Sequence, residues 1–243
     1  MRATFPPHLR VIVAGLCAMA AFAIGASRPL AATQRVSIRT EDGITLAGTW
    51  YEPSTRPAPA VVLVHMLQKD RRDWDSLAIR LAAQGVGTLT FDLRGHGESQ
   101  GTRPEDLSVM VQDVRAARRF LVGLTDVVPG RLGLAGASLG ANLAALLAAG
   151  DSSITSVALL SPSLDYRGVR IEPAVRKLAG RPLLLVAGDD DPYAVRSVRD
   201  LHKATGGKAE TALLPGAGHG TTMLLRDPGL PGRLVDWFRR TLL

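Results

Sequence analysis

The chain has 243 residues, enough for one domain with a substantial core. Hydrophobic residues make up 46% of it and aromatic residues only 5%, and its formal net charge is +7. A nucleic-acid-binding surface needs a concentrated basic patch with interleaved aromatic side chains, and the sequence has neither, so that class of partner is excluded.

The first 32 residues resemble a secretory signal sequence. Arg2 and Arg10 precede an apolar stretch from Val11 to Ala26, and small residues follow up to Ala32. The stretch is shorter than the roughly 20 residues that a membrane-spanning helix needs, so we expect cleavage near Ala32 and no stable membrane span afterwards; an uncleaved anchor is the alternative. The mature chain would be exported, to the periplasm or the medium, as one domain over residues 33–243.

The leader carries three of the positive charges and no acidic residue, which leaves +4 on residues 33–243. The remaining arginines stand among acids, as in the segments 71–73 and 113–119, and this mixture predicts solvated helix faces. The one cysteine, Cys17, lies in the leader, so the mature chain can form no disulfide.

Strands alternate with helices along the rest of the chain, the pattern of a mostly parallel sheet covered by helices on both faces. The predicted strands span residues 36–40, 44–51, 60–64, 86–91, 131–135, 156–161, 183–187 and 208–214. The predicted helices span residues 74–84, 104–122, 139–149 and 231–242. The first two strands are joined through Glu41-Asp42-Gly43, a hairpin signal, and Trp237 and Phe238 of the last helix are expected to pack on the sheet.

The segment 136–140 reads Gly-Ala-Ser-Leu-Gly, between a predicted strand and an alanine-rich helix. A serine hydroxyl becomes a good nucleophile when it is held exposed on a sharp strand-to-helix turn beside a base, and the turn tolerates only small neighbours. This context predicts that Ser138 is a nucleophile and that the backbone N–H of Leu139 belongs to the oxyanion hole. The alternative is a glycine-rich connection with an incidental serine.

Partners for this serine follow in the expected order, an acid first and a histidine last. Asp189, Asp190 and Asp191 follow the seventh predicted strand, and His219 follows the eighth between two glycines. Of the 5 histidines, His8, His65 and His96 precede the serine, and His202 falls in a charged helix, which leaves His219. The three consecutive aspartates leave the acid open, and Asp165, after the sixth strand, is a further candidate.

From about residue 35 onward the chain resembles the α/β-hydrolase superfamily, in particular its small lidless serine esterases and dienelactone-hydrolase-like members. The matching segments are Val-Val-Leu-Val-His at 61–65, Asp-Leu-Arg-Gly-His-Gly-Glu-Ser at 92–99, the serine turn at 136–140, Gly-Asp-Asp-Asp-Pro at 188–192 and Gly-His-Gly at 218–220. The resemblance implies the α/β-hydrolase fold, with a mostly parallel central sheet, helices on both faces and no cap domain. Two positions depart from the pattern: dienelactone hydrolases carry a cysteine where Ser138 stands, and the usual His-Gly after the third strand is His65-Met66.

The resemblance also implies roles for single residues. Asp191 stands at the family's Gly-x-x-Asp spacing from Gly188 and is followed by Pro192, so it is the preferred acid. The second oxyanion donor is the backbone N–H of Leu67 or, less favoured by the alignment to the family pattern, that of Met66. The segment 92–99 is expected to form a turn scaffold.

These features predict an exported serine hydrolase that cleaves small-molecule esters with short acyl chains through a Ser-His-Asp triad and an acyl-enzyme. An amide or peptide hydrolase or an acyltransferase would use the same residues, and a catalytically silent binding protein is the alternative of another class. Residues 162–181 leave room only for a loop and one short helix, so we expect an open site. No metal-ligand spacing and no phosphate-binding glycine loop occurs, so neither a metal nor another cofactor is expected.

Overall fold

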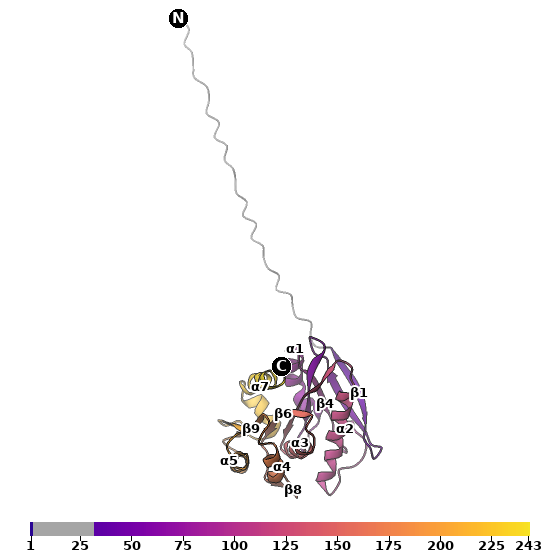
Figure 1. Ribbon diagram of the computed structural model, residues 1–243, viewed down its shortest axis with the longest axis vertical. Coiled ribbons are helices and arrows are strands. Elements are labelled where there is room, and N and C mark those ends of the chain that lie inside the picture. Colours follow the sequence, from indigo (N-terminus) through magenta and orange to yellow (C-terminus); the bar gives the residue numbers. More distant parts are fainter. Residues whose placement is uncertain (2–31) are drawn as a thin grey trace.

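The computed structural model describes Met1 and residues 32–243, so the predicted signal sequence lies almost entirely outside the described residues (Figure 1). The strands are β1 (Thr33–Arg39), β2 (Thr45–Tyr51), β3 (Ala58–Val64), β4 (Gly87–Phe91), β5 (Val127–Ala137), β6 (Ile154–Leu160), β7 (Asp165–Tyr166), β8 (Val169–Arg170), β9 (Leu183–Gly188) and β10 (Glu210–Leu214). The α-helices are α1 (Asp75–Ala83), α2 (Val111–Val122), α3 (Leu139–Gly150), α4 (Glu172–Lys177), α5 (Pro192–Ala204), α6 (Met223–Arg226) and α7 (Leu230–Leu242). Three 3₁₀ turns are η1 (Arg71–Trp74), η2 (Leu107–Met110) and η3 (Gly220–Thr222).

The main sheet has 8 strands in the order β1-β2-β4-β3-β5-β6-β9-β10. β2 runs antiparallel to both of its neighbours, and β4, β3, β5, β6, β9 and β10 run parallel to one another, so the predicted mostly parallel sheet is confirmed. The chain moves from β3 to β4 on one side and then crosses to β5 on the other. In such sheets, ligands bind beyond the carboxyl ends of the strands at the point where the order reverses, which here lies between β3 and β5.

Helices cover both faces of this sheet (Figure 1). Buried side chains of α2, α3, α4 and α5 pack in one core with one face, and those of α1 and α7 pack in a second core with the other. Trp237 and Phe238 of α7 are 2% and 0% exposed, and the Phe238 ring lies directly over Gly133 of β5. Their predicted packing on the sheet is therefore confirmed.

Strands β1 and β5 begin three and four residues earlier than predicted, α5 and α6 add to the four predicted helices, and two further differences have a local cause. The α-helix predicted from residue 104 begins only at Val111, because the Asp106 carboxylate accepts the N–H of Ser108 and starts a 3₁₀ turn instead. Between β6 and β9 the chain forms α4, as expected, but also a small hairpin of β7 and β8. Asp165 accepts the N–H of Gly168 at 2.7 Å to close that hairpin, and Gly168 has a φ of +88° that favours glycine.

Residues 162–181 thus hold a two-stranded hairpin and one short helix, and no cap domain is inserted in this described segment. Within the part of the chain that the structure describes, no helix combines the length and the apolar character needed to cross a membrane.

Candidate active site

Ser138 lies on a sharp turn between β5 and α3, at the reversal point of the sheet. Its φ of +52° and ψ of −117° lie in a region that costs a non-glycine residue on the order of 1–3 kcal/mol and that persists mainly at functional sites. A side-chain carbon at Gly136 would lie 2.1 Å from the carbonyl oxygen of Gly140, and one at Gly140 would lie 2.4 Å from that of Val64. Gly136 therefore lets the first turn of α3 pack against β5, and Gly140 lets that turn close against β3.

The N-terminus of α3 offers a donor beside this serine. Leu139 is the first residue of the helix, so its N–H has no carbonyl one turn earlier to bond within the helix. No other described residue accepts a hydrogen bond from this N–H. It is therefore available to a negatively charged oxygen near Ser138.

The carboxylates of the aspartate loop accept different hydrogen bonds. Asp189 accepts the N–H of Gly216 at 2.8 Å, and Asp190 accepts that of Gly218 at 2.8 Å. Asp191 accepts the N–H of Ala194 at 3.1 Å through Oδ1, which caps α5, and its Oδ2 lies 2.5 Å from a histidine ring nitrogen. The structure thus separates two aspartates that brace the loop from one that reaches a histidine.

That ring nitrogen is Nδ1 of His219, in the loop after β10. The two loops can approach because Gly188 has no side chain: a carbon there would lie 2.3 Å from the carbonyl oxygen of Gly218. Since the Asp191 carboxylate is an acceptor, the His219 proton lies on Nδ1, and Nε2 is an acceptor that bonds to no other described residue. The His219 side chain is 48% exposed.

The loop of His219 also reaches the serine turn. A side-chain carbon at Gly220 would lie 3.7 Å from Cβ of Ala137, the residue before Ser138. Within residues 32–243 no hydrogen bond joins Oγ of Ser138 to His219. Catalytic hydrogen bonds of this kind are often long without substrate and tighten in the substrate complex.

The loop after β3 begins at His65, which is fully buried. The N–H of Leu93 donates to Nε2 of His65 at 2.9 Å, so Nδ1 carries the proton and donates to the carbonyl oxygen of Met66 at 2.8 Å. Burial lowers the pKa of His65 to about 4, which keeps the ring neutral. The N–H groups of Met66 and Leu67, the predicted oxyanion donors, bond to no other described residue.

The carboxylate of Asp165, the remaining candidate acid, makes no hydrogen bond to His219 in the described part of the chain. Its carboxylate pairs with Arg170 and with the N–H of Gly168 inside the β7–β8 hairpin. Among the described residues, no group of three or more histidine, cysteine, aspartate or glutamate side chains could hold a metal ion.

Known proteins with this fold resemble the chain, and one protein family includes it. A sequence profile of the family described as serine aminopeptidase, S33, matches residues 55–183, which is more than half of the chain. The chain belongs to this family of α/β hydrolases. The resemblance and the fold predicted from the sequence are thereby confirmed.

Relatives of this α/β hydrolase extend over most of its length. An uncharacterised protein of Mycobacterium tuberculosis is 33% identical over 237 residues, which cover 89% of this chain and 82% of the relative. An esterase of Pyrococcus furiosus superposes with a TM-score of 0.74 at 20% identity, covering 88% of this chain and 92% of that one. A dienelactone hydrolase of Anabaena variabilis superposes with a TM-score of 0.71 at 19% identity, covering 88% and 100%. At these identities the two structures support the fold alone.

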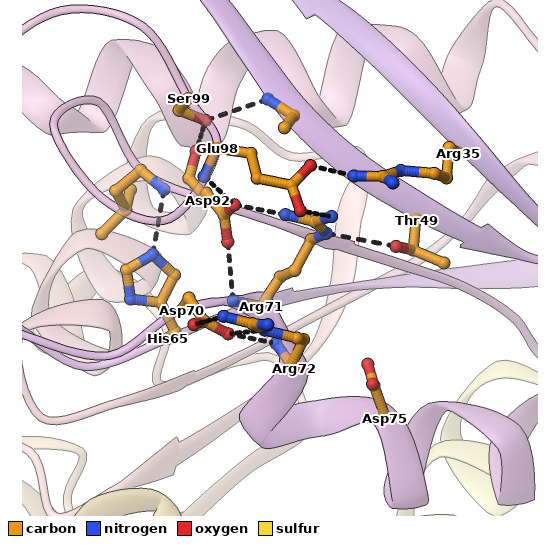
Figure 2. A network of polar contacts seen from close by, with 12 residues as sticks. Arg35, Thr49, His65, Asp70, Arg71, Arg72, Asp75, Asp92, Glu98 and Ser99 are labelled. Carbon is orange, nitrogen blue, oxygen red and sulfur yellow. Dashed lines mark hydrogen bonds and ion pairs between the residues drawn. The ribbon is translucent and has the colours of Figure 1, made fainter.

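A buried polar network lies beside the loop after β3, and no sequence pattern indicated its link to Arg71 (Figure 2). Asp92 is fully buried and accepts the backbone N–H of Arg71 at 2.7 Å and that of Glu98 at 2.9 Å, and it forms an ion pair with the Arg71 guanidinium. Oγ of Ser99 donates to the Asp92 carbonyl oxygen at 2.6 Å. The segment 92–99 is thus the turn scaffold that the sequence suggested, and it holds the far end of the loop that begins at His65.

The prediction that the charged residues of segments 71–73 and 113–119 form solvated helix faces is wrong for two of those residues. Arg71 is 5% exposed because its guanidinium pairs with Asp92, and Asp113 is fully buried because it pairs with Arg94 at 2.6 Å. Both pairs join residues far apart in the sequence, and no local charge pattern distinguishes them from exposed neighbours such as Arg72.

Proposed function

We propose that this α/β hydrolase cleaves carboxylic esters through Ser138, His219 and Asp191. The observation that carries the proposal is the 2.5 Å hydrogen bond between Nδ1 of His219 and Asp191. The loop that makes it packs against a serine turn with positive φ, at the reversal point of the sheet. What sets His219 apart from His65, His96 and His202 is its partner: its ring nitrogen bonds to a carboxylate, whereas theirs bond to backbone groups.

In the proposed reaction, Oγ of Ser138 attacks the ester carbonyl carbon while Nε2 of His219 takes the hydroxyl proton. The tetrahedral intermediate collapses, the C–O bond to the alcohol breaks, and the imidazolium returns the proton to the leaving oxygen. Water then attacks the acyl-enzyme with His219 again as base, which releases the acid and restores the serine. Asp191 holds the Nδ1 tautomer and stabilises the imidazolium.

The developing oxyanion would be held by backbone donors. We assign these to the N–H groups of Leu139 and Leu67, with Met66 as the alternative to Leu67. Each such donor contributes about 3 kcal/mol to the stabilisation of the transition state in serine hydrolases. The hydrogen bonds of His65 support this assignment because they fix the Met66 carbonyl group and so the orientation of the following N–H.

We infer that the substrates are esters with short acyl chains, roughly two to six carbons. Each methylene contributes ~0.8 kcal/mol only where it can be buried. The exposure of the His219 side chain and the short connection between β6 and β9 leave little apolar cover for a longer chain.

The second candidate is hydrolysis of an amide or peptide, favoured by the description of the family as serine aminopeptidases. The same triad would serve, and transfer of the acyl group to an acceptor other than water would make the protein an acyltransferase. A catalytically silent binding protein of this fold is the alternative in another class.

A fluorophosphonate probe separates enzyme from binding protein because it reacts only with an activated serine. We expect covalent labelling of the wild type, none of Ser138→Ala, and full labelling of Ser156→Ala, a buried serine on the same sheet. Failure to label the folded wild type would contradict the proposed function.

A series of chromogenic esters of increasing acyl length, measured beside the amide analogue of the best ester, then tests the substrate class. A steady rise of kcat/KM toward long acyl chains would contradict the short-chain inference.

A further inference from the structure

The carboxyl end of β6 touches the segments of both proposed reacting residues. The backbone N–H of Ser138 donates to the carbonyl oxygen of Leu160 at 2.9 Å. The next residue along, Ser161, accepts the backbone N–H of Gly220 at 2.9 Å through its hydroxyl oxygen. Gly220 follows His219 directly. Two consecutive residues at one strand end therefore hold the nucleophile on one side and the base on the other.

Ser161 is held in a costly conformation while it makes this contact. It is fully buried and has a φ of +46°, a left-handed value that favours glycine. Its own N–H donates to the carbonyl oxygen of Val186 on β9 at 2.7 Å. Strained residues of this kind persist where the surroundings determine them, and they cluster at active sites. Glycine would adopt this left-handed backbone conformation more easily. It would not supply the hydroxyl oxygen that accepts the N–H of Gly220.

The segment after His219 is fixed from the opposite side as well. Oγ1 of Thr221 donates to Oδ2 of Asp73 at 2.5 Å. Asp73 lies in η1, directly beyond the loop that carries Met66, and a side-chain carbon at Gly220 would lie 2.5 Å from the Met66 sulfur. The residues after the base are thus clamped between β6 and the proposed oxyanion loop.

We propose that Ser161 is a positioning residue that sets the distance between Ser138 and His219. The inference rests on the proposed function and extends it. Ser161 does not touch the substrate; it acts through the N–H of Gly220. A displacement of about 1 Å in a catalytic group can cost about 100-fold in rate, so one hydrogen bond at this place has a large effect on turnover.

The test is Ser161→Ala, measured with kcat, KM and the rate constant of fluorophosphonate labelling on folded protein. We expect kcat and the labelling rate to fall together by about 10- to 100-fold, with KM within about twofold of wild type. The loss stays below that of Ser138→Ala because the contact between Thr221 and Asp73 remains.

The matched control is Ser156→Ala on the same strand. Ser156 is also fully buried, and its hydroxyl also makes one hydrogen bond, to Thr241 at 2.7 Å, away from the site. Both variants should lose comparable thermal stability, but only Ser161→Ala should lose turnover. If kcat of Ser161→Ala stays within twofold of wild type, the positioning role is overturned while the triad stands.

A second variant, Ser161→Gly, separates positioning from stability. It removes the hydroxyl and relieves the left-handed strain, so we expect it to be more stable than Ser161→Ala yet equally slow. If the alanine variant fails to fold, Ser161→Gly alone tests whether the hydroxyl is needed for turnover. Recovery of wild-type kcat in Ser161→Gly would overturn the inference, whereas an unreactive wild type would overturn the proposed function itself.

Discussion

Asp189, Asp190 and Asp191 are chemically identical neighbours whose carboxylates accept different donors. Only Asp191 reaches His219, whereas the other two accept backbone N–H groups of the histidine loop. Asp191→Asn should therefore reduce kcat by several orders of magnitude, since it favours the wrong histidine tautomer. Asp189→Asn and Asp190→Asn should stay within about tenfold of wild type, because an amide oxygen can still accept an N–H.

Initial rates on one ester, measured on variants shown to be folded, give this ranking. Asp165→Asn serves as the control, since among the described residues the Asp165 carboxylate bonds only to Gly168 and Arg170 of its own hairpin. If Asp165→Asn or Asp189→Asn lost most of the activity while Asp191→Asn kept nearly the wild-type rate, the acid would be wrongly assigned.

His65 gives the fold a pH dependence with a definite sign. Burial lowers its pKa to about 4, against 6.5 for an unperturbed histidine. Well above pH 6.5 the His65 ring is neutral in both the folded and the unfolded protein. As the pH falls toward 4, His65 binds a proton in the unfolded protein but stays neutral in the folded one. The free energy of unfolding should therefore fall by up to about 3 kcal/mol over this window from His65 alone.

Urea unfolding of wild type and His65→Gln at several pH values between 7.5 and 4.5 isolates this contribution. We expect a lower free energy of unfolding in the variant at neutral pH, because two hydrogen bonds are disturbed, but a shallower decline toward acid. If the free energy of unfolding fell equally with pH in both proteins, the predicted contribution of His65 would be contradicted.

At the serine turn, the junction of β5 and α3 depends on the absence of a side chain. A carbon at Gly136 would lie 2.1 Å from the backbone oxygen of Gly140, so Gly136→Ala should lower the free energy of unfolding by about 3 kcal/mol or more. At Gly150, the last residue of α3, no atom lies within 4 Å of the added carbon. Gly150→Ala should therefore stabilise the protein by about 0.5–1 kcal/mol.

Urea denaturation of both variants measures this contrast, and the same substitution at the end of β5 and at the end of α3 is its own control. If Gly136→Ala were as stable as wild type, the tight packing of the first turn of α3 against β5 would be refuted.

Local pattern was enough to predict the eight strands of the main sheet and the segments that carry the candidate site. Apolar runs, the glycines around Ser138 and the order of the later segments are all properties of neighbouring residues. The bonds from Ser161 to Gly220 and from Arg71 to Asp92 were not predictable in this way. Each joins residues on different elements, and the residues near them in the sequence resemble those of ordinary loops. The same holds for the start of α2, which depends on the side-chain bond of Asp106.

For the whole chain, export remains a prediction from the sequence of the first 32 residues. Cleavage near Ala32 would leave every described strand and helix intact, because β1 begins at Thr33. Protein recovered from a bacterial periplasm or from the medium should therefore have an N-terminus near Thr33 by N-terminal sequencing. An intact Met1 on the native protein would contradict this prediction.

The most direct test of the proposed catalytic unit is the kcat of Ser138→Ala, His219→Ala and the double variant on one ester. Residues that act as one unit are strongly non-additive, so removing either should cost nearly the whole acceleration that the pair supplies. We predict that all three variants fall to similar residual rates, several orders of magnitude below wild type. Losses that multiply in the double variant, or a His219→Ala variant close to wild type, would contradict a shared role of Ser138 and His219.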